Sequence, residues 1–77
     1  MKVYYFLQAE MDLRPNVRAK VESSYVVPLL SFSKGKTLEE LLEQTRMELP
    51  TFTAREIFED LLEGIREGFI GAQLEEN

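Results

Sequence analysis

The chain has 77 residues and a formal net charge of −5, and it contains neither cysteine nor histidine. This composition excludes disulfide frameworks, zinc fingers and haem ligation by histidine or cysteine, and it leaves only carboxylates as metal ligands. The acidic total also argues against a general polyanion binder, which normally carries a basic surplus.

The charge is divided unevenly along the chain. Residues 1–36 carry six lysines and arginines against three acidic residues, a net charge of +3, whereas residues 37–77 carry three against eleven, a net charge of −8. We expect one domain over 1–77, with a strand region at 1–36 and a helical region at 37–77. The apolar start of the chain ends at Gln8 without a cleavage site, and no long apolar run follows, which predicts a cytoplasmic protein that makes no membrane contact.

The first region has the alternation that is typical of strands. Apolar side chains recur with a period of two over residues 2–11, which predicts a half-covered strand. Residues 12–16 have the composition of a turn, and the same alternation over 17–27 predicts a second strand that pairs with the first and ends at Pro28. Residues 29–33 fit either a third short strand or a loop.

Two capping boxes mark the starts of two helices. Thr37 with Glu40 and Thr53 with Glu56 have the spacing in which each side chain caps the other residue's backbone N–H. The first helix is expected to begin at Leu38 and to close at Pro50. The sequence therefore predicts an α+β fold, in which an N-terminal antiparallel β-hairpin or small sheet is followed by two amphipathic α-helices.

The second helix carries two adjoining apolar stripes, which make a face wider than one helix and a small sheet would cover. An exposed apolar area of that size predicts a homodimer, and its candidate interface residues are Phe58, Leu62, Gly64, Ile65 and Phe69. Gly68 or Gly71 is expected to end this helix in a left-handed conformation, and residues 75–77 to form a frayed tail. The residues expected in the core are Leu42, Leu61, Leu62 and Ile65.

The sequence offers binding chemistry rather than catalytic chemistry. Without histidine and cysteine the usual pairs of nucleophile and base are missing, so we predict no catalytic residue, metal, cofactor or small-molecule substrate. The candidate nucleic-acid-binding residues are five of the six basic residues of the first region, Arg14, Arg18, Lys20, Lys34 and Lys36. Tyr4 and Phe6 either share a sheet face with these residues, as in single-strand binders, or pack under the helices.

Two short resemblances add expectations about function. Residues 37–71, TLEELLEQTRMELPTFTAREIFEDLLEGIREGFIG, resemble the N-terminal helical part of HU/IHF-type DNA-bending proteins, and the preceding segment is similar to the extension on HU-related proteins of the Bacteroidetes type. This resemblance implies an intertwined dimer and a DNA-associated role. The sequence ends before the basic arms of that family, so no DNA-contact residue carries over.

The segments KVYYFLQAEM and SKGKTLEELLEQTRMEL also look like parts of HicB-type antitoxins, which would make the molecule a protein-binding neutraliser. We therefore expect a non-catalytic, HU-like accessory or regulatory protein that associates with DNA or with a DNA-binding partner. The alternative is an antitoxin-like or structural protein–protein interaction module.

Overall fold

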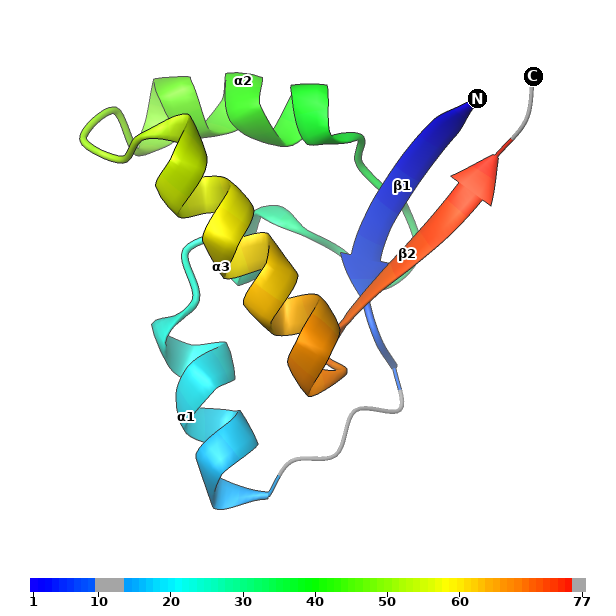
Figure 1. The fold of residues 1–77 in the computed structure, drawn as a ribbon, viewed down its shortest axis with the longest axis vertical. Coiled ribbons are helices and arrows are strands. Elements are labelled where there is room, and N and C mark those ends of the chain that lie inside the picture. Colours follow the sequence, from blue (N-terminus) through cyan, green and yellow to red (C-terminus); the bar gives the residue numbers. More distant parts are fainter. Residues whose placement is uncertain (10–13, 76–77) are drawn as a thin grey trace.

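The computed structural model describes residues 1–9 and 14–75. Along the chain its elements are β1 (Lys2–Leu7), α1 (Pro15–Ser23), the 3-10 helix η1 (Val27–Leu29), α2 (Leu38–Glu48), α3 (Ala54–Glu67) and β2 (Ile70–Glu75). This arrangement confirms the α+β class (Figure 1). Predictions for residues 10–13 and 76–77 lie outside the described part. None of the helices in that part is both long and apolar enough to cross a membrane.

The sheet joins the two ends of the chain rather than two neighbouring segments. β1 pairs with β2 in an antiparallel register that runs from Lys2 opposite Glu75 to Leu7 opposite Ile70. The prediction that residues 17–27 pair with the first strand was therefore wrong. The prediction that Glu75 belongs to a frayed tail was also wrong, because Glu75 is the last residue of β2. The predicted division into a strand region and a helical region also fails, because β2 lies in the second region and α1 in the first.

The predicted second strand is mostly the helix α1. Pro15 stands in the first turn of α1, where its fixed φ suits a helix and its missing N–H costs nothing. Val17 is buried and Val21 packs against the core. A spacing of four residues fits one face of a helix as well as it fits the alternation of a strand. The apolar pattern of this segment therefore could not distinguish a helix from a strand.

The two predicted capping boxes are both present. The Thr37 hydroxyl accepts a hydrogen bond from the Glu40 N–H at 3.2 Å, and the Glu40 carboxylate accepts one from the Thr37 N–H at 3.0 Å. Thr53 and Glu56 repeat this geometry at the start of α3. α3 ends at Gly68, whose φ of +87° is the left-handed conformation expected there.

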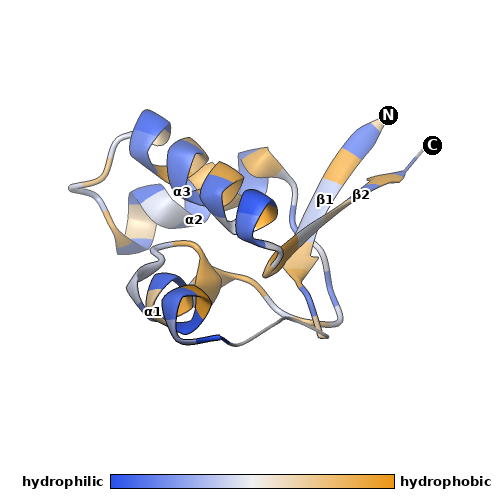
Figure 2. Ribbon diagram, turned by 60° about the horizontal axis from the view of Figure 1, so that its bottom comes forward, coloured by the Kyte–Doolittle hydropathy of each residue, from blue (hydrophilic) through white to orange (hydrophobic). Residues whose placement is uncertain are grey.

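Residues 29–33 form no strand. They contain the end of η1 and then a loop, which is joined to β1 by a hydrogen bond from the Leu7 N–H to the carbonyl oxygen of Ser31 and by an isolated bridge between Lys36 and Tyr5. Figure 2 shows the apolar segment around η1 between α1 and the pair α2–α3, where it closes the lower side of the core.

The core lies between the helices and the inner face of the sheet. Among the described residues, its buried apolar side chains come from every element of the fold and from the segments that join them: Leu7, Val17, Val26, Leu29, Leu30, Leu41, Ile57, Leu61, Phe69 and Ile70. Of the four predicted core residues, Leu61 is fully buried and Leu42 is partly buried against the core, whereas Leu62 and Ile65 are exposed. Phe69 and Ile70 fill the space that those two were expected to occupy, because the chain turns back at Gly68.

Candidate functional site

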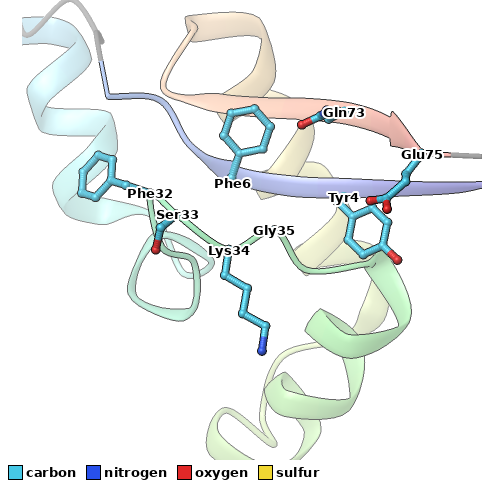
Figure 3. Close-up of a pocket in the computed structure, with 8 residues that line it drawn as sticks. All are labelled: Tyr4, Phe6, Phe32, Ser33, Lys34, Gly35, Gln73 and Glu75. Carbon is cyan, nitrogen blue, oxygen red and sulfur yellow. The ribbon is translucent and has the colours of Figure 1, made fainter.

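An aromatic hollow lies on the outer face of the sheet. The alternation of β1 turns Tyr4 and Phe6 away from the core, on the face opposite Tyr5 and Leu7. These two rings, Gln73 and Glu75 of β2, and the loop over residues 32–35 line a hollow of about 420 Å³ (Figure 3). Of the two alternatives for these rings, packing under the helices is therefore not realised.

The loop beside the hollow is held close to β1. A Cβ atom at Gly35 would lie only 2.7 Å from the Cβ of Tyr4, so this position requires glycine or a shift of the strand. The hydroxyl of Ser31 donates to the carbonyl oxygen of Lys34 at 3.0 Å and accepts from its N–H at 3.2 Å, which closes a tight turn. The hollow therefore has a fixed wall.

The five basic candidates do not form one surface. Arg14 and Arg18 belong to the start of α1, and Lys20, also on α1, makes an ion pair with Glu67 of α3 at 3.1 Å. Lys36 turns inward, where its ammonium donates to the carbonyl oxygen of Leu29 and to the amide oxygen of Gln44. Among the five, only Lys34 lines the aromatic hollow, and its side chain extends away from the Phe6 ring (Figure 3).

The five predicted interface residues separate into two groups. Gly64 and Phe69 are buried within the single chain. A Cβ at Gly64 would lie 2.2 Å from Cδ1 of Ile70, so this glycine admits β2 rather than a second helix, and the assignment of Gly64 and Phe69 to a surface contact was wrong.

The remaining three residues form an exposed apolar row, which we call the α3 stripe. Phe58, Leu62 and Ile65 are exposed by 41%, 38% and 36%, and their spacing of four and three residues places them on one side of the helix. Asp60 and Glu67, which contact residues 24–26 and Lys20, lie on the opposite side. No element of the described residues 1–9 and 14–75 buries this stripe.

Asp60 is a structural residue that the sequence analysis missed. One of its carboxylate oxygens accepts hydrogen bonds from the Ser24 hydroxyl at 2.7 Å and from the N–H groups of Tyr25 and Val26 at 3.0 Å each. The loop after α1 is thereby attached to α3. The sequence did contain a signal, since Asp60 is the single aspartate among ten glutamates in residues 37–77, and a short side chain suits such a fixed position.

Acidic side chains gather beside Asp60 without forming a metal site. Glu56, Glu59 and Glu63 line a shallow, open hollow there together with Tyr25 and Arg66. The Tyr25 ring lies 4.0 Å from that of Phe52, centroid to centroid. Within residues 1–9 and 14–75, no three acidic side chains converge closely enough to hold a metal ion.

Comparison of the chain with models of protein families, with curated proteins and with solved structures finds no match. The resemblances to HU/IHF-type proteins and to HicB-type antitoxins therefore stay predictions. What the described residues offer for binding is an aromatic hollow on one face of the sheet and the α3 stripe.

Proposed function

We propose that this protein is a small, non-catalytic regulatory protein that binds another protein through the α3 stripe. The observation that carries the proposal is the position of Phe58, Leu62 and Ile65, three large apolar side chains that stay exposed although α3 has a separate buried side. Contiguous exposed apolar side chains with a polar surround are typical of interaction sites. Anchors at positions i, i+4 and i+7 suit a partner with an apolar groove that receives a helix.

The charge of α3 favours a protein partner over DNA. The helix carries five acidic residues and two arginines, so a phosphate backbone that approached the stripe would be repelled. A groove with a basic rim fits the same helix by charge complementarity. Of the five basic candidates for a DNA-associated role, Lys34 lies beside the aromatic hollow, whereas Lys36 turns inward and Lys20 pairs with Glu67. A cytoplasmic location belongs to this proposal, and a chain without cysteine is compatible with such a reducing compartment.

The experiment is affinity capture from the source cells with a matched pair of variants. Leu62→Glu places a charge in the stripe, and Met47→Glu makes the same change at an exposed apolar residue of α2. Both variants are first compared with the wild type by circular dichroism. The captured complexes are cross-linked, and the peptides joined to this chain are identified. We expect partner peptides with the wild type and with Met47→Glu, and we expect them to be lost with Leu62→Glu.

The opposite result would place the binding site elsewhere. If Leu62→Glu retains the partner while Lys34→Gln or nuclease treatment removes it, binding runs through nucleic acid near the hollow and the stripe proposal is wrong.

A further inference from the structure

We propose that β2 pairs with β2 of a second copy of this chain, which makes a four-stranded antiparallel sheet with a two-fold axis at Gln73. This proposal concerns the edge of the sheet and does not depend on the α3 stripe.

Within residues 1–9 and 14–75, the two edges of the sheet differ in what lies beside them. The far edge of β1 is occupied at Tyr5 and Leu7, because Tyr5 and Lys36 exchange two backbone hydrogen bonds of 2.8 and 2.9 Å, and the Leu7 N–H donates to the carbonyl oxygen of Ser31 at 2.9 Å. In the described ranges the sheet holds two strands in the order β1–β2, so β1 is the one strand beside β2 there. In the described part of the chain, nothing pairs with the other edge of β2 (Figure 1).

The register fixes which backbone groups this edge presents. Tyr5 directs both its N–H and its C=O toward Lys36, so its pair with Ala72 is one of the non-hydrogen-bonded pairs of the β1–β2 ladder. Because the two kinds of pair alternate, Gln73 and Gly71 form their ladder bonds with β1. The N–H and C=O groups of Ala72 and Leu74 therefore point outward from the free edge.

This edge lacks the features that normally prevent pairing between chains. Natural edge strands carry charged residues, prolines or bulges, whereas residues 70–74 read IGAQL and the first charge is Glu75. On the inner face, Leu74 is 55% exposed and lies beside Val3, which is 37% exposed. A second sheet edge would cover Leu74 at the same time as it satisfied the backbone groups.

The free edge is complementary to itself. With the axis at Gln73, Ala72 lies opposite Leu74 of the second copy, and both residues present outward N–H and C=O groups, as a hydrogen-bonded pair requires. The same register places Glu75 opposite Gly71 of the second copy, so no like charges face each other. One patch therefore serves both subunits, which is the condition for a two-fold contact.

A single introduced cysteine tests the register directly, because the chain has no cysteine of its own. Gln73→Cys would lie opposite its own copy in a non-hydrogen-bonded pair, where the Cα atoms are close enough for a disulfide. Glu75→Cys, on the same face of the same strand, would lie about four residues, or roughly 13 Å, from its own copy. We expect rapid oxidation of Gln73→Cys to a covalent dimer and little dimer with Glu75→Cys.

Sedimentation of the unmodified chain provides the second measurement. We expect a mass twice the 9.0 kDa of one chain. Leu74→Lys should shift the protein to the monomer mass, because the two lysines would approach each other diagonally across the axis. Val3 lies on the same face but on β1, one strand away from the proposed contact. Val3→Lys should therefore remain dimeric.

The proposal is overturned if the wild type sediments as a monomer, or if both cysteine variants oxidise equally fast. It is also overturned if Leu62→Glu dissociates the dimer while Leu74→Lys does not, because the second copy would then occupy the α3 stripe. A monomer that still captures a partner through Leu62 would leave the proposed function standing, so the two proposals fail separately.

Discussion

Replacing Asp60 by alanine tests whether one side chain attaches the loop after α1 to α3. The substitution removes the acceptor of three hydrogen bonds, from the Ser24 hydroxyl and from the N–H groups of Tyr25 and Val26. Val26 is fully buried, so its N–H is the donor at which water replaces the lost acceptor least easily. Tyr25 is exposed and its N–H can be hydrated again.

The expected loss follows from counting only the donors that stay unsatisfied. Leaving a buried donor unpaired costs about 1–3 kcal/mol, and hydrogen bonds to a charged acceptor contribute about 1.5–3 kcal/mol each. With one donor fully lost and the others partly compensated, Asp60→Ala should lower the free energy of unfolding by about 2–4 kcal/mol. For a domain of this size that corresponds to a melting temperature lower by at least about 8 °C.

Urea denaturation and a thermal melt measure this loss, and Glu63→Ala is the matched control because it removes an equal charge from the same acidic hollow. Asp60→Asn should fall between the two, since it keeps one oxygen as an acceptor. If Asp60→Ala and Glu63→Ala unfold within about 0.5 kcal/mol of each other, the range of ordinary surface substitutions, the loop is held by something other than this carboxylate.

Three further predictions concern single residues. Leu61→Ala should cost about 2–5 kcal/mol because Leu61 is fully buried, whereas Leu62→Ala should cost well under half as much in the same urea titration; equal losses would mean that Leu62 is buried in solution. Gly68→Ala should cost about 1–2 kcal/mol, because alanine is strained at a φ of +87°, and an unchanged melting temperature would contradict this C-terminal cap. The hydrogen bonds from the backbone and side chain of Thr37 lower the pKa of Glu40, so the stabilisation by Glu40 is present above its unfolded pKa, about 4.3, and is lost as pH falls through the lower folded pKa. The stability difference between wild type and Glu40→Gln should therefore shrink on acidification, and a difference that grows would refute this sign.

The two later helices could be predicted from the sequence because their signals are local. Each capping box lies within four residues, and Gly68 ends α3 through its own backbone conformation. α1 could not be distinguished from a strand, since Val17 and Val21 satisfy both periods. β2 could not be found because its partner is β1, at the opposite end of the chain, and nothing within IGAQLE specifies that pairing.

The candidate site was predictable only in part for the same reason. The periodicity of α3 showed a broad apolar face, yet which half stays exposed depends on Phe69 and Ile70, which turn back over Gly64 and fill the core. The inward turn of Lys36 depends on Leu29 and Gln44, which come near it only in the folded chain. Side chains whose environment is set by distant segments were therefore the ones misassigned.

The pairing of Lys2–Leu7 with Ile70–Glu75 also has a kinetic consequence, since every helix lies in the chain between these two strands. Closing so long a loop costs chain entropy before any ladder bond forms, and contacts between distant residues slow folding. α2 and α3 carry their own start signals and can gain helical structure early, whereas Tyr5, Leu7 and Ile70 reach the core only when the two ends meet. We therefore expect helical circular dichroism to develop ahead of amide protection in the strands during refolding, with docking of the chain ends as the rate-limiting event.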